Sequence, residues 1–204
     1  NCAAGTSLNQ LLTTDLNNDG KEDIIATLLP SNEVVWYENN GENDFSLLET
    51  LISSGLNNAS ICIDDLNNDN NLDIILSSAD SYTTVWYKNE ELPYFTTHQA
   101  IGTNNSGSSQ ITTADLDNDD YTDVILKGNV VYWYKNNGNG SFSSQKFIGN
   151  AGYTNYADKT MVDDLDNDGD VDVFSTNRQE TVLNLHQNLY YHGNLQGVCY
   201  YDLN

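Results

Sequence analysis

The sequence predicts an all-β protein: a β-propeller of four blades, each with four antiparallel strands, in a single domain over residues 1–204. Three observations support this prediction. An acidic nine-residue loop occurs four times, and its first aspartates, at positions 15, 65, 115 and 164, lie 50, 50 and 49 residues apart. A short apolar run follows each loop, and a segment rich in Trp, Tyr and Asn follows that run. No stretch has the periodicity of an amphipathic helix.

Each repeat contains about four short strand signals. In the first repeat we expect strands at 9–14, 23–28, 33–38 and 45–51. The run after each loop is short, apolar and mostly β-branched, which is typical of a buried strand. The expected blades are about 6–54, 55–104, 105–153 and 154–204, with residues 1–5 joining the fourth blade and closing the ring at the termini.

The acidic loops have the composition of a calcium site. Oxygen donors at alternate positions of a tight turn suit a hard cation with six to eight ligands. We expect positions 1, 3, 5 and 9 to offer side chains and position 7 to offer its backbone carbonyl. The candidate ligands, with one calcium ion per blade, are Asp15, Asn17, Asp19, Lys21, Asp23, Asp65, Asn67, Asp69, Asn71, Asp73, Asp115, Asp117, Asp119, Tyr121, Asp123, Asp164, Asp166, Asp168, Asp170 and Asp172.

Two other interpretations of these loops are weaker. An EF-hand needs a bidentate glutamate at position 12, where this chain has Ala26, Leu76, Leu126 and Ser175. Plain Asx-rich turns would not require carboxylates at positions 1, 5 and 9 of every copy. Position 6 is Gly or Asx in all four copies, and these residues tolerate the left-handed backbone that a sharp loop needs.

The loops and the aromatic segments resemble a known family. Residues 15–25, 164–174 and 34–41 are similar to FG-GAP/VCBS repeats, the calcium-loop blades of integrin α-subunit heads, certain fungal lectins and many secreted bacterial proteins. The resemblance implies a propeller in which a calcium loop joins the first two strands of each blade. It also implies ligation at loop positions 1, 3, 5, 7 and 9. Most members have seven blades, so a chain of four repeats departs from that pattern.

The cysteines bear on ring closure. Cys199 follows the first aspartate of the fourth loop by 35 residues, and Cys2 precedes that of the first loop by 13, which is nearly the same position in a repeat of about 50. We therefore expect a Cys2–Cys199 disulfide that joins the termini of a closed four-bladed monomer. The alternative is a dimer of eight blades, with these cysteines bridging the chains. Cys62 falls in a first strand and is expected to be a free, buried thiol.

Composition limits the partners. Thirty acidic and seven basic residues give a net charge of −23, which disfavours nucleic acid and anionic membrane surfaces. No apolar run is long enough to insert into a membrane. The chain begins at Asn1, which suggests a mature product whose signal peptide has been removed, and glycosylation sequons start at Asn58, Asn104 and Asn139. We expect a secreted glycoprotein.

The aromatic segments carry the functional question. Trp and Tyr pairs followed by Asn suit sugar recognition, but large aromatics also fill the wedge between propeller blades. The weak candidates for ligand contact are Trp36, Tyr37, Trp86, Tyr87, Trp133 and Tyr134. The three histidines occupy unrelated repeat positions without a nucleophile motif, so no enzyme is expected. The leading hypothesis is a multivalent lectin that binds glycans or glycoproteins, and the alternative is an adhesion or assembly module without a sugar ligand.

Overall fold

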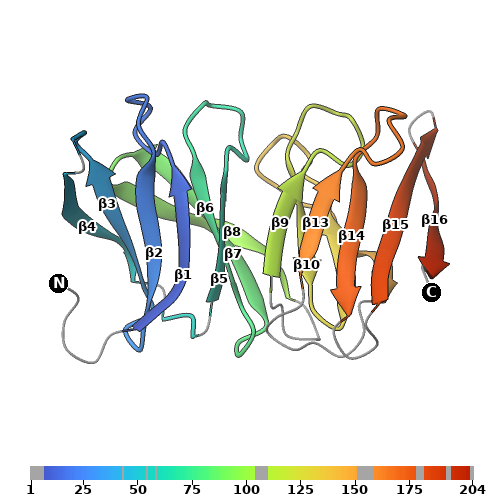
Figure 1. Cartoon of the computed structure of the whole chain (residues 1–204), viewed down its shortest axis with the longest axis horizontal. Helices are drawn as coiled ribbons and strands as arrows, with labels where there is room; N and C mark the ends of the chain where they lie inside the picture. Colours follow the sequence, from blue (N-terminus) through green and yellow to red (C-terminus); the bar gives the residue numbers. More distant parts are fainter. Residues whose placement is uncertain are drawn as a thin grey trace.

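The computed structural model describes residues 7–42, 44–53, 55–57, 59–103, 110–150, 159–177, 182–191 and 194–202. These residues form strands and connecting turns, and the described part of the chain holds no helix that could cross a membrane. The sixteen described strands lie in four sheets of four, and each sheet comes from one repeat. Figure 1 shows the sheets following one another in chain order.

The strands of each sheet pair antiparallel in chain order. The first sheet holds β1 (Ser7–Thr14), β2 (Asp23–Leu29), β3 (Glu33–Asn39) and β4 (Phe45–Ser53). The second holds β5 (Ala59–Asp64), β6 (Asp73–Ser78), β7 (Thr83–Glu91) and β8 (Tyr94–Thr103). The third holds β9 (Gln110–Ala114), β10 (Asp123–Lys127), β11 (Val130–Tyr134) and β12 (Lys146–Asn150). The fourth holds β13 (Thr160–Asp163), β14 (Asp172–Asn177), β15 (Val182–Tyr191) and β16 (Asn194–Asp202). The predicted all-β, four-bladed propeller is confirmed.

In the first three blades, the second strand is the most buried element. Every residue of β6 and of β10 is buried. Side chains of a strand alternate between the two faces of its sheet, so burial along the whole strand means that both faces are covered. This is why the run after each acidic loop is apolar without alternation.

Apolar clusters join successive blades at three junctions. Each junction contains the tryptophan and the loop leucine of the earlier blade, together with apolar residues from the first two strands of the later one. At the first junction, Leu16 and Trp36 pack with Ile61 and Ile74. Because alternate residues of a strand face opposite ways, each blade offers one apolar set to the preceding blade and another to the following blade.

Polar contacts repeat across the same junctions. The Gln10 amide nitrogen donates to the Ile61 carbonyl at 3.1 Å, and its oxygen accepts from the Ile61 amide at 3.1 Å. Gln110 forms the same pair of bonds with Thr160, at 3.2 and 2.6 Å. The acidic loops also touch one another, since Asn18 donates to the Asn70 carbonyl at 3.2 Å and Asn68 to the Asp120 carbonyl at 2.9 Å.

Closure at the termini is the one part of the fold prediction that the described strands do not show. In Figure 1 the first sheet lies at one end of the row and β15 and β16 lie at the other. Cys2 and the side chain of Cys199 lie outside the described residues, so their disulfide stays a prediction. Cys62 is a free, partly buried thiol whose pKa is raised by burial.

Gly102 in β8 is expected to be essential for the second junction. A Cβ at this position would lie 2.3 Å from Cε1 of Tyr134 in the next blade. Alanine normally stabilises a strand relative to glycine, but here it overpacks the junction, so Gly102→Ala should destabilise the protein by about 1–3 kcal/mol. Urea denaturation measures this. Ala100→Ser on the same strand, at an exposed position, is the control; equal stability of both variants would contradict the junction packing.

Candidate metal loops and candidate ligand pocket

The last aspartate of each acidic loop anchors the loop to its blade. Asp23, Asp73, Asp123 and Asp172 are fully buried or nearly so. Oδ2 of Asp123 accepts from the Leu116 amide at 3.1 Å, and Oδ1 accepts from the Asn136 amide at 2.7 Å. The first two blades repeat both bonds. The position 9 carboxylate therefore joins the start of the loop to the end of the third strand, with or without a metal ion.

The first aspartate of each loop folds the turn around its own carboxylate. Asp15 accepts from the Asp19 amide at 3.0 Å and from the Gly20 amide at 2.8 Å. The same pair of bonds recurs in the other three loops. Positions 4 and 6 have positive φ in every loop, 58° and 86° at Asn18 and Gly20. The positive φ at position 6 explains why only Gly, Asn and Asp occur there, as the sequence predicts.

The loops gather oxygen donors in one place. In the third loop, carboxylate oxygens of Asp115, Asp117 and Asp119 lie within 4.8 Å of one another, and those of Asp164, Asp166 and Asp168 do so in the fourth. The first two loops have Asn17 and Asn67 at position 3, whose amide oxygens are also hard donors. The donor chemistry and the wrapped backbone fit a calcium ion.

Position 7 supplies its amide to the loop in all four copies. The backbone nitrogens of Lys21, Asn71 and Tyr121 donate to Oδ1 of the aspartate two residues earlier, at 2.9–3.1 Å. Asp170 does the same, and its side chain accepts from Asn118 of the preceding blade at 2.7 Å. That the position 7 carbonyls bind the metal stays a prediction. The Asp170 side chain forms a hydrogen bond across the third junction.

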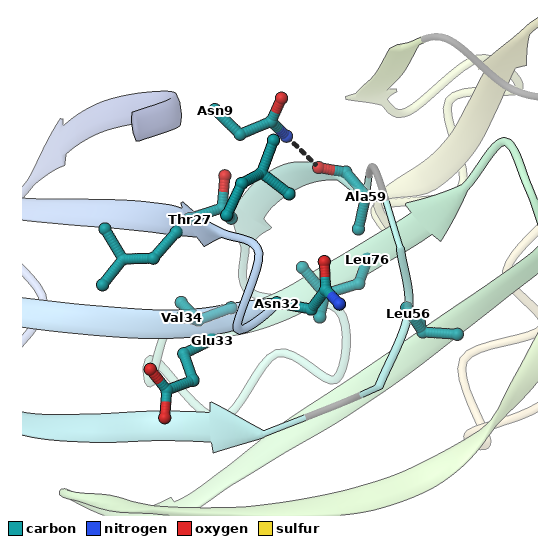
Figure 2. A pocket seen from close by; sticks show the side chains of 10 residues that line it. Asn9, Thr27, Asn32, Glu33, Val34, Leu56, Ala59 and Leu76 are labelled. Carbon is teal, nitrogen blue, oxygen red and sulfur yellow. Dashed lines mark hydrogen bonds between the residues drawn. The ribbon is translucent and has the colours of Figure 1, made fainter. Parts of the chain in front are cut away.

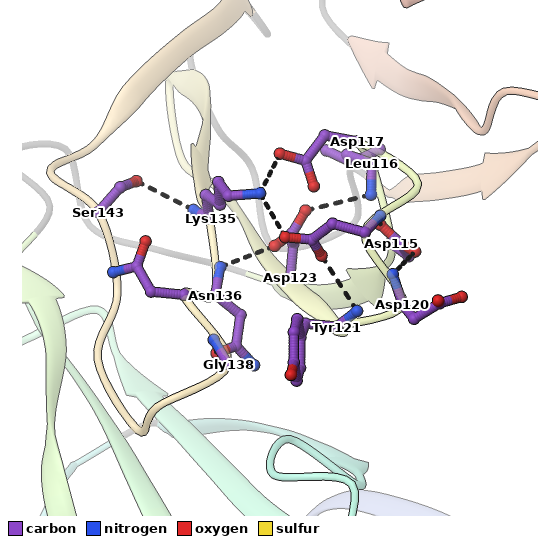
Figure 3. Close-up of polar contacts among 12 residues, drawn as sticks. Asp115, Leu116, Asp117, Asp120, Tyr121, Asp123, Lys135, Asn136, Gly138 and Ser143 are labelled. Atoms are coloured by element: carbon purple, nitrogen blue, oxygen red, sulfur yellow. Dashed lines mark hydrogen bonds and ion pairs between the residues drawn. The ribbon is translucent and has the colours of Figure 1, made fainter. Parts of the chain in front are cut away.

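In the first three blades, the residue before the last Asn of the aromatic segment reaches the acidic loop, a contact that loop composition alone does not reveal. The Lys135 ammonium contacts Asp117 and also Asp119, the latter at 2.5 Å (Figure 3). Burial acts to lower the pKa of Lys135, but hydrogen bonds to the two carboxylates outweigh it and raise the pKa. In the second blade the equivalent residue is Lys88, whose ammonium lies 3.6 Å from the Asp69 carboxylate. In the first blade it is Glu38, which accepts a hydrogen bond from the Asn17 side chain at 2.9 Å.

Burial perturbs two of the anchoring carboxylates. It raises the pKa of Asp73 to about 6 and that of Asp123 to about 7, although hydrogen bonds from backbone amides act in the opposite direction. A cation in the loop favours the charged form of a nearby carboxylate.

The three tryptophans lie in the core, where a ligand could not reach their rings, and this corrects the expectation that they contact a ligand. Trp36, Trp86 and Trp133 are 6%, 1% and 2% exposed. Phe142 packs edge-on against Trp86, with ring centroids 6.0 Å apart, and the Lys146 ammonium lies 4.1 Å from the centroid of the Trp133 ring. Tyr87 and Tyr134 are buried as well, and Tyr37 is partly exposed. Filling the wedge between blades takes the ring faces that a sugar would need.

A small pocket with a cavity volume of about 10 Å³ lies between the first two blades, at the ends of the strands opposite the acidic loops (Figure 2). Its polar lining comes from Asn9, Thr27, Asn32 and Glu33. The apolar lining comes from Leu28, Leu29, Val34, Leu56, Ala59 and Leu76. Asn9 donates to the Ala59 carbonyl at 2.9 Å, and Asn32 donates to Oδ1 of Asn57 at 2.7 Å.

The lining of the pocket differs from the corresponding positions of the second blade. Where the first blade has Asn32 and Glu33, the second has Tyr82 and Thr83. The repeated motifs do not reveal the pocket, because its polar residues Asn9, Asn32 and Glu33 lie outside them. A polar side over an apolar side is the usual arrangement of a small-ligand site.

Ser175 and His186 form a pair that resembles a nucleophile and its base, with Oγ and Nε2 3.0 Å apart. Both side chains are almost completely buried, and burial lowers the pKa of His186 to about 4. A substrate has no access to this pair. Of the three sequons, Asn58 and Asn104 lie outside the described residues, and Asn139 is exposed in a turn.

Comparison with known proteins agrees with the fold. A lectin of Agrocybe aegerita, whose structure concerns recognition of non-reducing terminal N-acetylglucosamine, is similar with a TM-score of 0.60 at 19% identity, over 88% of this chain and 49% of the lectin. The Photorhabdus luminescens Tc holotoxin pore is similar with a TM-score of 0.54 at 15% identity, over 84% of this chain and 8% of that one. This chain thus spans about half of the lectin and a small part of the toxin.

The search of curated proteins found no match. The profile of the FG-GAP-like repeat matches residues 15–76 and 65–126, each match running from one acidic loop through the next. Together the matches cover more than half of the chain and include three of the four loops. With the loop geometry and the four sheets, they show that this chain belongs to the FG-GAP-like repeat family.

Proposed function

We propose that this protein is a secreted, calcium-binding lectin that recognises terminal N-acetylglucosamine or a related sugar. The observation that carries the proposal is the pocket between the first two blades, which joins polar Asn9, Asn32 and Glu33 to an apolar side. Carboxylates and amides bind sugar hydroxyls, and apolar side chains cover the C–H face of a pyranose ring. The likeness to the Agrocybe aegerita lectin supports the ligand class.

The pocket would seat only part of one sugar residue. Its cavity volume is about 10 Å³, against the roughly 300–1,000 Å³ of sites that enclose drug-sized ligands, so most of the sugar would stay in contact with solvent. The pocket residues do not recur in the second blade, so we propose one principal site per chain rather than equal sites around the ring. Multivalency then requires more than one chain.

Calcium belongs to the proposal as a structural ion. The position 1, 3 and 5 side chains of each loop would hold it, with Glu38 as a further donor in the first blade. When bound, the ion supplies positive charge that offsets the repulsion among the gathered carboxylates. Secretion is proposed with it, because extracellular calcium is abundant enough to fill sites of modest affinity.

Glu33→Ala should weaken sugar binding at least fivefold, because it removes the one charged acceptor of the pocket. Isothermal titration with a disaccharide that ends in N-acetylglucosamine measures the affinity. Thr83→Ala is the matched control, since Thr83 holds the equivalent strand position in the second blade and does not line the pocket. Wild-type binding that survives Glu33→Ala would place the site elsewhere.

A further inference from the structure

The three blade junctions bury the same positions each time. On the side of the earlier blade, the loop leucines Leu16, Leu66 and Leu116 are 1%, 1% and 3% exposed. On the side of the later blade, Ile61 and Ile111 of the first strands are 2% and 5% exposed. We call the side of a blade that meets the next blade its forward face, and the side that meets the preceding blade its backward face.

The forward face of the fourth blade exposes what the other forward faces bury. Leu165, the fourth loop leucine, is 55% exposed. Met161 is 68% exposed, although Cys62, which holds the same strand position in the second blade, packs in the second junction. Phe174, which corresponds to the buried Ile25 and Ile75, is partly exposed. Large apolar side chains at these positions are typical of an interaction surface.

The backward face of the first blade has the matching property. Leu11 is 50% exposed, although it corresponds to the buried Ile61 and Ile111. Beside it lie Ala26, Leu28 and Val35, an apolar cluster that is already buried in the single chain and separate from the three junction clusters. The chain thus carries both halves of an interface that it builds three times within itself.

The geometry points to a second copy of this chain as the partner. We propose that the forward face of the fourth blade meets the backward face of the first blade of the other copy, in the same arrangement as the internal junctions. Two copies related by a twofold axis then cover all four end faces and close a ring of eight blades, since a head-to-tail contact that repeats by rotation generates a ring.

The polar part of the junction fits this arrangement. Asn18 and Asn68 donate to the position 6 carbonyl of the next loop at 3.2 and 2.9 Å. Asn167 holds the same loop position in the fourth blade, with a φ of 59° against 58° at Asn18. In the ring, the Asn167 amide donates to the Gly20 carbonyl of the second copy.

Light scattering coupled to gel filtration, with calcium present, tests the proposal. The expected mass is twice the 22.7 kDa of one chain. Met161→Glu and Leu11→Glu, one on each end face, should each give single chains with unchanged circular dichroism, because both side chains are already exposed in one copy. Tyr94→Glu, an exposed aromatic on the outer strand β8, should stay dimeric. A wild-type mass of one chain, or a series of masses that grows with concentration, would overturn the proposal.

Engineered cysteines test the register directly. At the second junction, Cys62 Sγ lies 3.6 Å from Thr113 Oγ1. The equivalent pair between copies is Met161 and Thr13, so a mixture of Met161→Cys chains and Thr13→Cys chains should form a disulfide between peptides that carry these positions. Met161→Cys mixed with Tyr94→Cys should not. A link within one chain of the double variant, at the mass of a single chain, would instead establish a closed ring of four blades.

Discussion

Removing calcium is expected to lower the melting temperature by 20 °C or more, on the order expected when four saturated sites are lost. A site at 100 times its dissociation constant adds about 2.7 kcal/mol to stability, so four independent sites add on the order of 10 kcal/mol. In a chain of this size, 1 kcal/mol moves the melting temperature by about 2–4 °C. The physical reason is that carboxylates such as Asp115, Asp117 and Asp119 converge within 4.8 Å.

Scanning calorimetry with and without EDTA measures this effect. EDTA already saturated with calcium is the control for nonspecific effects of the chelator, and it should leave the transition in place. Added magnesium should restore little of the loss, because magnesium demands a stricter octahedron than a flexible loop offers. An unchanged transition in free EDTA would contradict the metal assignment of all four loops.

Trp86→Ala is expected to destabilise the protein by about 3–5 kcal/mol, the range for truncating a fully buried tryptophan. Trp86 is 1% exposed, belongs to the cluster of the second junction and packs edge-on with Phe142. The loss should include the cavity left between two blades, because strands on both sides are held by their own hydrogen bonds and cannot collapse into it. Urea denaturation reports the free energy of unfolding.

Tyr94→Ala is the matched control for this substitution. Tyr94 is an aromatic of the same blade, but it is 71% exposed, so its truncation should change stability by no more than about 0.5 kcal/mol. Under conditions where the Trp86→Ala variant remains folded, its affinity for the sugar should equal that of the wild type. If Trp86→Ala lost sugar binding but kept its stability, Trp86 would be a ligand-contacting residue rather than only a core residue.

The repeat predicted the fold well because its signals are local. In the first blade, strands expected at 9–14, 23–28, 33–38 and 45–51 occur at 7–14, 23–29, 33–39 and 45–53. The Asx and Gly residues of the acidic loops fix both strand boundaries and turn geometry. Spacing, loop chemistry and β-branched runs therefore carried nearly all the information about each separate blade.

Features that depend on how blades meet could not be predicted in the same way. The angle between neighbouring sheets depends on the side chains that fill the wedge between them, such as Trp36 and Leu16. No sequence pattern predicts this angle. Ring closure depends on that angle. The pocket around Asn32 and Glu33 also forms only where two blades meet. The contacts of Lys135 with Asp117 and Asp119 join residues from two segments whose proximity follows from strand pairing.

The central claim is that this propeller binds a glycan through the pocket between its first two blades. A glycan array probed with the labelled protein in calcium tests it most directly. We expect binding to glycans that end in N-acetylglucosamine, competed by the free monosaccharide and reduced in Glu33→Ala but not in Thr83→Ala. No binding to any glycan by folded, calcium-loaded protein would contradict the lectin assignment and favour an adhesion or assembly module.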